Sequence, residues 1–323
     1  MSEIYCKVGT MRFETQAAEY IIWIQTRRRN PVRPATARIY QSYLDAHILP
    51  FFSSWRLDEI DNGAVKGFIA VLNKHDLSPS TINQVFNVVK AVIASAVDSD
   101  GNERYPRKWN HDFLDLPVVN KGDVDAPIVT PEQVNAAILS TSGQFQAMLV
   151  LLAASGLRIG ECLALTTYPA GIGESFWSPI SATIYVKSTL VSGKVAPQPK
   201  TDAGNREIDL HPEINAFLIA ANLPSTGFLF QNREGNAVRY NTILEQLNDI
   251  GIDEGFHAFR RFRATHLESQ NVPRSLLAFW LGHAGSTITD RYIKIGSDFD
   301  TRREWASRAG YGFTLPKESD DNR

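Results

Sequence analysis

The chain has 323 residues, enough for about two domains that each bury a core. Its 43% hydrophobic and 21% charged residues are typical of a soluble globular protein, and its net charge of −2 excludes a strongly basic chain. The longest apolar run, Ala147 to Ala154, is far shorter than the ~18 residues of a membrane span. Because no signal pattern opens the chain and neither Cys6 nor Cys162 has a metal-type spacing, we predict a cytoplasmic protein that uses no metal.

Four amphipathic helices are predicted in the first third of the chain, because apolar residues recur there at three- and four-residue steps. Ser78-Pro79-Ser80 supplies a start signal for the last of these helices. Short loops between the helices indicate a small all-α domain over residues 11–115. The four apolar stripes are Phe13, Ala17, Tyr20, Ile21 and Ile24; Tyr40, Tyr43, Leu44 and Ile48; Val65, Phe68, Ile69 and Leu72; and Ile82, Val85, Phe86, Val89, Val92, Ile93 and Ala96.

A second domain is predicted over residues 127–310, after an aperiodic polar linker at residues 116–126. Thr130-Pro131-Glu132 is typical of a helix start, alternation predicts strands over 181–190 and 206–210, and the chain is helical again after His211-Pro212. Residues 167–179 look like an inserted loop, and residues 311–323 like a disordered tail. The predicted fold class is therefore mainly α with a small antiparallel β-sheet.

Four stretches of the second domain carry the candidate chemistry. They are Ser155-Gly156-Leu157-Arg158-Ile159-Gly160-Glu161; Pro199-Lys200-Thr201 with Gly204 and Arg206; His257-Ala258-Phe259-Arg260 ending in Ala264-Thr265-His266; and Leu281-Gly282-His283 followed by Ser286, Thr287 and Tyr292. In this order and spacing they resemble the tyrosine recombinase family, which includes phage integrases and Xer-type recombinases. The likeness covers residues 127–308, and Leu77 to Asn83 is more weakly similar to that family's core-binding domain.

The resemblance implies a group of cations around a DNA phosphate. Cleavage of a phosphodiester adds negative charge to the non-bridging oxygens, and preorganised cations aimed at that charge supply most of the rate. By resemblance Arg158 and Arg260 are the two arginines, whose planar forks donate paired hydrogen bonds. His283 would donate another hydrogen bond to the phosphate, and His257 would assist proton movement at the nucleophile.

The resemblance makes Tyr292 the nucleophile and Lys200 the general acid that protonates the departing 5′-oxygen. The 3′-phosphotyrosyl bond keeps the energy of the cut bond, so religation needs neither ATP nor a cofactor. The sequence agrees, since it has no Walker loop, HExxH motif or carboxylate cluster for two metals. Glu161 lies one helical turn after Arg158 and is predicted to orient Arg158 or His283.

The implied partner is double-stranded DNA at an inverted-repeat core site, held by the two domains as a clamp, with four chains in the working complex. Residues 300–309 are predicted to be helical, and in the family such a tail packs onto a neighbouring subunit. The short stretch before the first helix predicts no arm-binding domain. Predicted DNA contacts are Arg27, Arg28, Arg29, Arg261 and Arg263, although a solvated helix end explains the first three equally well.

Two other functions remain open at this point. A DNA-binding regulator without catalysis would keep the fold, but all six catalytic positions hold suitable residues. A type IB topoisomerase would use the same chemistry without strand exchange, and the length and helical first domain favour a recombinase over it.

Overall fold

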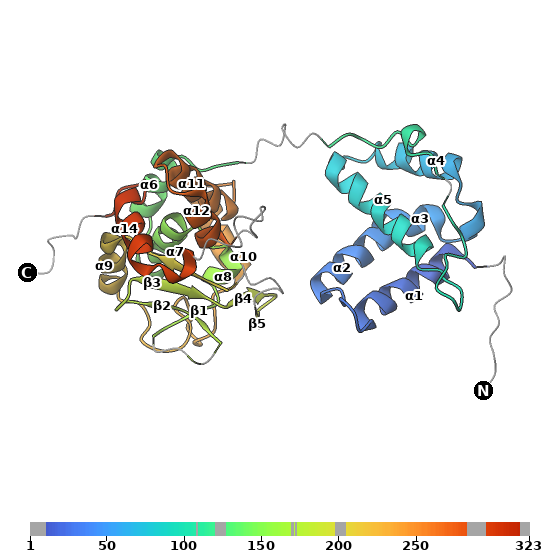
Figure 1. Cartoon of the computed structure of the whole chain (residues 1–323). Coiled ribbons are helices and arrows are strands. Elements are labelled where there is room, and N and C mark those ends of the chain that lie inside the picture. Colours follow the sequence, from blue (N-terminus) through green and yellow to red (C-terminus); the bar gives the residue numbers. More distant parts are fainter. Residues whose placement is uncertain are drawn as a thin grey trace, which may run out of the picture. The chain divides into compact units, whose positions relative to one another are not determined.

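The computed structural model describes residues 11–107, 109–119, 127–168, 171, 173–197, 205–282 and 295–316. The chain divides into two compact units, residues 1–124 and residues 125–323 (Figure 1). No helix in these described ranges is long and apolar enough to cross a membrane. The fold class predicted from the sequence, mainly α with a small sheet, is confirmed.

The first unit is a helical bundle, as the apolar stripes predict. Its helices begin where the sequence signals them: the Ser78 hydroxyl accepts a hydrogen bond from the Thr81 backbone N–H at 3.2 Å, and Pro79 opens the helix. One stripe, at Tyr40 to Ile48, spans an α-helix and a following π-helical turn, Leu44–Ile48. The helices are α1 (Phe13–Thr26), α2 (Pro34–Tyr43), α3 (Leu49–Phe52), α4 (Asn62–Leu72) and α5 (Pro79–Ala94).

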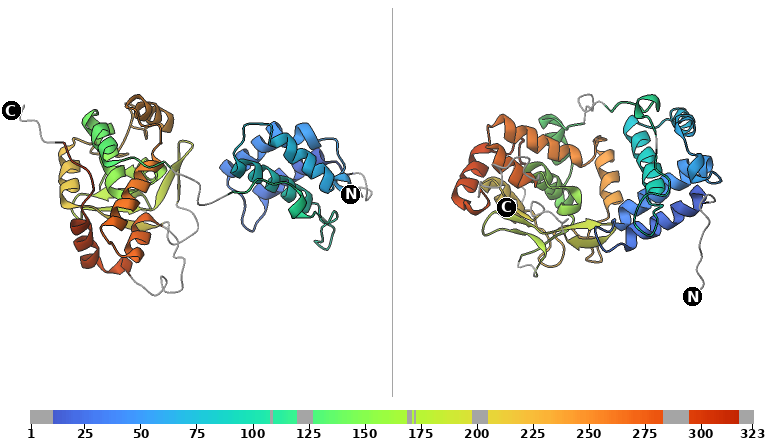
Figure 2. Two further views of the ribbon diagram at one scale, coloured as in Figure 1. Left: turned by 90° about the horizontal axis from the view of Figure 1, so that it is seen from above. Right: turned by 45° about the vertical axis from the view of Figure 1, so that its right-hand side comes forward.

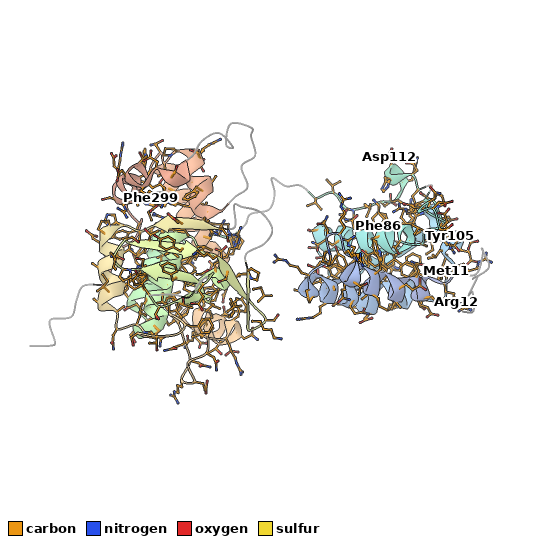
Figure 3. All side chains as sticks on the ribbon, turned by 60° about the horizontal axis from the view of Figure 1, so that its bottom comes forward. Met11, Arg12, Phe86, Tyr105, Asp112 and Phe299 are labelled. Carbon is orange, nitrogen blue, oxygen red and sulfur yellow. The ribbon has the colours of Figure 1, made fainter. Side chains whose placement is uncertain are left out.

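Aromatic rings fill the core of this unit. Phe52 lies 4.9 Å from Phe68 and 5.7 Å from Phe13 between ring centroids, and all three are buried. Phe86 of α5 (labelled in Figure 3) has its ring centroid 5.6 Å from that of Trp109, in the segment after α5. Trp109 also donates its indole N–H to the Ile60 carbonyl at 2.9 Å, so this returning segment is fastened across the bundle.

The second unit surrounds one helix that is buried on every side. Residues 147–155 of α7 (Gly143–Ser155) are all buried, which explains why the apolar run in the sequence has no helical period. Thr130 caps the preceding helix through a reciprocal pair with Gln133, as the start signal predicts. The other helices are α6 (Pro131–Leu139), α8 (Ile159–Cys162), α9 (Pro212–Ala220), α10 (Tyr240–Asp249), α11 (His257–Ser269), α12 (Arg274–Leu281) and α14 (Phe299–Ala309).

The sheet of this unit lies along one side, with α6, α7 and α11 on the other (Figure 1, Figure 2). Four strands have the order β1-β2-β3-β6, and a separate hairpin joins β4 to β5. The β1–β2 pair is parallel, whereas the sequence predicts only antiparallel pairs. The strands are β1 (Leu165–Thr166), β2 (Ser175–Ser178), β3 (Thr183–Val186), β4 (Ser188–Val191), β5 (Lys194–Pro197) and β6 (Arg206–Asp209).

Two sequence predictions about these strands need correction. The single strand expected at 181–190 is broken at Lys187, because the backbone N–H groups of Lys187 and Ser188 both turn to the Ser175 hydroxyl at 2.8 and 2.7 Å. The expected inserted loop at 167–179 contains β2, which pairs with both β1 and β3. β2 is four residues long and too short to show a strand period in the sequence.

The predicted disordered tail is also wrong for residues 311–316. Phe313 is buried, the Tyr311 hydroxyl donates to the Glu213 carboxylate at 2.5 Å, and the Thr314 backbone N–H donates to Asn135 Oδ1 at 2.7 Å. These contacts fasten residues 311–316 to α9 and α6. The polar composition of the tail does not reveal such contacts, because they depend on partners far away in the sequence. Residues 317–323 lie outside the described residues.

Candidate active site

The candidate site begins at the C-terminal end of α7, where the chain turns abruptly. Gly156 ends this helix with a φ of +67°, and a Cβ at this position would lie 2.9 Å from Leu281 Cδ2. Glycine is therefore required both by the backbone angle and by the close approach of α12. The chain then turns directly into α8, whose first residue follows Arg158.

Arg158 is oriented by Glu161, as the sequence predicts. Its Nη1 lies 2.9 Å from Glu161 Oε1, and its backbone N–H donates to Glu161 Oε2 at 2.9 Å. The Arg158 side chain is 45% exposed, whereas that of Glu161 is 1% exposed. The buried carboxylate thus holds Nη1 of the guanidinium. The other N–H groups of the Arg158 guanidinium remain accessible to an anion from solvent.

Arg206 is a second partner of Glu161 that sequence reasoning placed on a strand without giving it a role. It donates from Nη1 and Nη2 to the two Glu161 oxygens at 3.1 and 2.8 Å, and from Nε to the Trp280 carbonyl at 2.7 Å. Burial by itself would raise the pKa of Glu161, but the hydrogen bonds and charge of Arg206, helped by Arg158, lower it to about 2. Glu161 therefore stays ionised and holds both arginines.

Arg260 approaches the same place from α11. Its side chain is buried, and it donates from Nη1 to the Gly156 carbonyl at 2.9 Å and from Nη2 to the Leu281 carbonyl. Burial and the nearby charge of Arg158 lower the pKa of Arg260 to about 10, partly offset by Glu161. The guanidinium remains charged at neutral pH, and the structure brings Arg158, Glu161 and Arg260 together as the sequence predicts.

His257 opens α11 one turn before Arg260, and its side chain is exposed. Partial burial lowers the pKa of His257, and the charges of Arg261, Arg260 and Arg158 lower it further. The imidazole is therefore neutral near pH 7 and able to accept a proton, which fits the role that the resemblance implies.

Gly160, between Arg158 and Glu161, lets the β4–β5 hairpin lie directly on α8. A Cβ at Gly160 would come within 2.7 Å of Thr189 Oγ1 and 2.9 Å of the Leu190 carbonyl. The hairpin ends at Pro197, shortly before Lys200 in the sequence. Lys200, His283 and Tyr292 lie outside the described residues, so their roles stay predictions.

The predicted DNA-contact arginines differ in their surroundings. Arg27 follows the last residue of α1 and lies 5.0 Å over the Trp23 ring, while Arg28 and Arg29 are exposed. Arg261 is half-buried and donates to the Pro127 carbonyl at 2.6 Å.

Arg263 is not placed to contact DNA, contrary to the sequence prediction. Its side chain is buried and donates to the Gly310 carbonyl at 2.7 Å, and burial lowers the pKa of its guanidinium to about 9. Arg263 lies three residues after Arg260 and therefore on the same inward face of α11. Its role is to fasten the segment after α14 to this helix.

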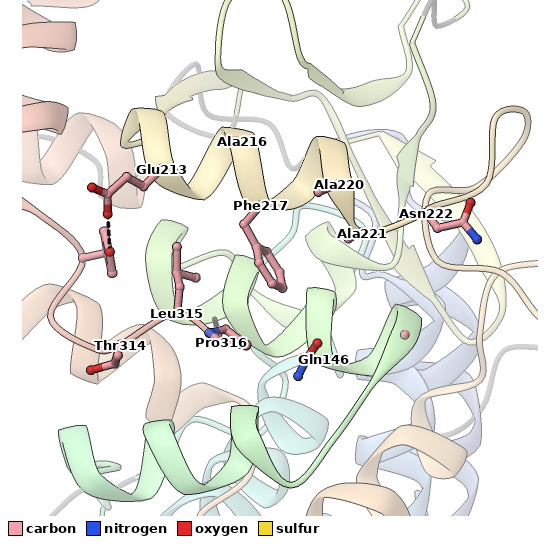
Figure 4. Close-up of a pocket in the computed structure, with 12 residues that line it drawn as sticks. Gln146, Glu213, Ala216, Phe217, Ala220, Ala221, Asn222, Thr314, Leu315 and Pro316 are labelled. Carbon is pink, nitrogen blue, oxygen red and sulfur yellow. Dashed lines mark hydrogen bonds between the residues drawn. The ribbon is translucent and has the colours of Figure 1, made fainter. Parts of the chain in front are cut away.

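A pocket of about 700 Å³ lies between α9 and residues 311–316 (Figure 4). Phe217, Ala220 and Leu315 give it an apolar wall, and Gln146 and Glu213 add polar groups. None of its lining residues belongs to the arginine group, so we do not assign it to the candidate active site.

Arg206→Met is expected to destabilise the second unit by about 3–5 kcal/mol, because the buried Glu161 carboxylate loses its main partner. Urea unfolding at pH 7 measures this loss. Since the pKa of Glu161 is lowered on folding, the ion pair stabilises fully above pH 4.5 and progressively less as the pH falls toward 2.

The control for that variant is Arg233→Met, which removes an exposed arginine and should change the free energy of unfolding by less than about 0.5 kcal/mol. The difference in free energy of unfolding between Arg206→Met and the unsubstituted protein should shrink as the pH falls from about 4.5 toward 2, the window set by the unfolded and folded pKa values of Glu161. A difference that stays constant over that range would contradict the assignment of the ion pair.

The chain is similar to known transposases and integrases. Residues 16–109 match the model of the phage integrase SAM-like domain. Transposase B from transposon Tn554 of Staphylococcus aureus is 19% identical over 312 residues, which cover 90% of this chain and 44% of the relative. Transposase B from transposon PsiTn554 of the same species is 19% identical over 255 residues, covering 74% of this chain and 39% of the relative. The chain thus spans less than half the length of these curated relatives.

Solved structures match over nearly the whole chain. The Tn1549 transposon integrase in complex with transposon right end DNA has a TM-score of 0.64 at 18% identity and covers 91% of this chain and 99% of its own. A lambda integrase dimer bound to a core site has a TM-score of 0.59 at 13% identity, covering 91% and 96%. The chain therefore has the fold of the tyrosine recombinases, and the resemblance predicted from the sequence is confirmed.

Proposed function

We propose that the chain is a site-specific DNA recombinase, which cuts and rejoins duplex DNA through a 3′-phosphotyrosyl intermediate on Tyr292. The observation that carries this proposal is the group formed by Arg158, Arg260 and His257. Two charged guanidiniums are fixed by hydrogen bonds, and their charges help to lower the pKa of the exposed His257 imidazole nearby. Such a group suits a phosphate that gains charge in the transition state and a hydroxyl that loses a proton.

In the proposed reaction the Tyr292 oxygen attacks phosphorus and the bond to the 5′-oxygen breaks. His257 receives the phenolic proton, and Lys200 gives a proton to the departing 5′-oxygen. Arg158 and Arg260, with His283, hold the non-bridging oxygens throughout. Attack by the 5′-hydroxyl of another strand reverses these steps and rejoins the DNA, so the number of phosphodiester bonds is conserved.

The proposed partner is double-stranded DNA with an inverted-repeat core site, and the proposed working form is a tetramer. Structural neighbours support both: the Tn1549 integrase was solved in complex with transposon right end DNA, and a lambda integrase tetramer was solved bound to a Holliday junction. Transposon relatives favour a mobile element as the setting. Arg28 and Arg29 are both exposed, and we propose that they contact the DNA backbone.

Covalent trapping tests this proposal. The protein is incubated with a nicked library of host DNA fragments, denatured in SDS, and the DNA that remains attached is sequenced. We expect adducts clustered at one inverted-repeat site, and none with Tyr292→Phe, because phenylalanine lacks the attacking oxygen. A strand-exchange assay between two such sites then separates a recombinase from a topoisomerase, which would form adducts but exchange no strands.

Tight binding to DNA in a separate assay without adducts from either protein would favour the catalytically silent regulator. Lys90→Ala is a suitable control, because this lysine lies over the Phe86 ring in the first unit and has no place in the proposed chemistry. It should form adducts at the rate of the unsubstituted protein.

A further inference from the structure

The last helix, α14, is fastened inside its own unit by a buried arginine. The Arg302 side chain is 0% exposed and grips Asp209 of β6 with two hydrogen bonds, from Nε at 2.8 Å and from Nη2 at 2.9 Å. Nη2 also lies 2.5 Å from Glu207 Oε2. α14 is thus fastened to the core of this unit by Arg302, and the expected packing of residues 300–309 on a neighbouring subunit stays a prediction.

The remaining arm of Arg302 holds the chain just before α14. Its Nη1 donates to the Gly296 carbonyl at 2.5 Å, and its guanidinium lies 5.1 Å from the Phe279 ring of α12. A Cβ at Gly296 would lie 3.1 Å from that same ring. Arg302 therefore holds the backbone at Gly296 close to the Phe279 ring of α12.

The end of α12 is held from the other direction. The Leu281 carbonyl accepts from Arg260, and the Trp280 carbonyl accepts from Arg206. The Trp280 indole N–H donates at 2.9 Å to Asp209, the same carboxylate that Arg302 grips. Residues 283–294, which include His283 and Tyr292, lie outside the described residues, but the residues on either side of them are held by contacts that share Asp209 and the Phe279 ring.

We infer that Arg302 is a positioning residue for Tyr292: by tying Gly296 to β6 and α12, it fixes the C-terminal end of the segment that carries the nucleophile. The inference rests on the function proposed above. Fixing both ends of a segment lowers the entropy lost when one of its residues is held in line with a phosphate. Arg260 and Arg206 hold the Leu281 and Trp280 carbonyls, which come just before this segment in the sequence.

The chemistry of the contacts favours positioning over simple stabilisation. A buried ion pair adds little to stability compared with well-packed apolar residues of similar volume. It does impose direction, because each guanidinium N–H requires an acceptor in the plane of the fork. Arg302 meets Asp209, Glu207 and the Gly296 carbonyl in this way, and an apolar side chain could not set the position of that carbonyl.

The test compares Arg302→Met with Arg303→Met, which removes the exposed arginine next to it. The probe is a nicked duplex that carries the site recovered by covalent trapping, used at saturating concentration in single-turnover reactions below the unfolding temperature of each protein. The rate constant of adduct formation and its final amplitude are measured separately, together with the affinity for the same DNA. A loss of folded protein lowers the amplitude alone, whereas a misplaced tyrosine lowers the rate constant.

We expect Arg302→Met to lower the rate constant by roughly tenfold or more, with DNA affinity unchanged within about twofold, because small misplacements at a reacting centre are costly. Arg303→Met should behave as the unsubstituted protein. Gly296→Ala is the second variant: it keeps every buried charge but pushes the Gly296 backbone from the Phe279 ring, and its rate constant should fall by roughly threefold or more. It decides the matter if Arg302→Met does not fold.

The outcomes separate the two proposals. If the unsubstituted protein forms no adduct, the proposed function is overturned and the inference falls with it. If it forms adducts and both Arg302→Met and Gly296→Ala react at its rate constant, the inference alone is overturned. A fall in amplitude without a fall in rate constant also overturns it, since Arg302 would then serve only stability.

Discussion

Arg158→Lys is expected to slow adduct formation by about 10²- to 10³-fold, the usual effect of losing one preorganised donor to a developing oxyanion. Lysine keeps the charge but lacks the planar fork, so it cannot donate to Glu161 and to a phosphate oxygen in the same geometry. The measurement is the single-turnover rate constant on the trapped site at saturating DNA. Because Arg158 acts on the transition state, DNA affinity should fall by less than roughly tenfold.

Arg28→Met is the matched control for this prediction. Arg28 is exposed beyond the end of α1, and its loss should weaken DNA binding and reduce the slope of log affinity against log salt by about 1. Its rate constant at saturating DNA should not change. Equal effects of both variants on affinity, with no effect of Arg158→Lys on the rate constant, would remove Arg158 from the chemical step.

Lys200→Ala is expected to slow cleavage of ordinary DNA by roughly 10²- to 10⁴-fold, as the loss of a general acid does. The decisive measurement uses the same duplex with sulfur in place of the bridging 5′-oxygen at the cleaved phosphate. A thiol has an unperturbed pKa of about 8.5, so a thiolate departs without being given a proton. The variant should then cleave at nearly the rate of the unsubstituted protein.

Arg158→Lys provides the control here, because the sulfur substrate still gains charge on the non-bridging oxygens and should remain slow. If Lys200→Ala stays slow on the sulfur substrate, Lys200 stabilises charge on the phosphate and the proton comes from another group. If Lys200→Ala is fast on both substrates, Lys200 is not the general acid that the family resemblance implies.

The sequence predicts best the features that depend on near neighbours. Three- and four-residue periodicity places the helices of the first unit, and the spacing of Arg158 and Glu161 predicts their contact one turn apart. The Thr130 and Ser78 caps follow from local motifs in the same way. The resemblance adds Arg260 and His257, which the fold brings to the same place from a helix about a hundred residues later.

What the sequence leaves out depends on distant partners. Arg206 meets a carboxylate 45 positions earlier, and Arg302 meets Asp209 93 positions earlier, so no local pattern marks either arginine as buried. Arg263 is different, because the three-residue step from Arg260, with Phe259 and Phe262 beside it, already indicates an inward face. The arginine-rich composition of α11 suggests DNA contact. The three-residue spacing of Arg260 and Arg263 is the better guide to which of its arginines are buried.

The arrangement around Asp209 has a consequence for the order in which the chain acquires its structure. Asp209 is buried, and its two partners, Trp280 and Arg302, lie 71 and 93 residues further along the chain. During synthesis from the N-terminus, the sheet cannot enclose this carboxylate until the last helix has left the ribosome, because an unpaired buried charge costs several kcal/mol. The arginine group at Gly156 and Leu281 is completed by the same late helices. We therefore expect a nascent or prematurely ended chain not to assemble the group formed by Arg158, Arg206 and Arg260.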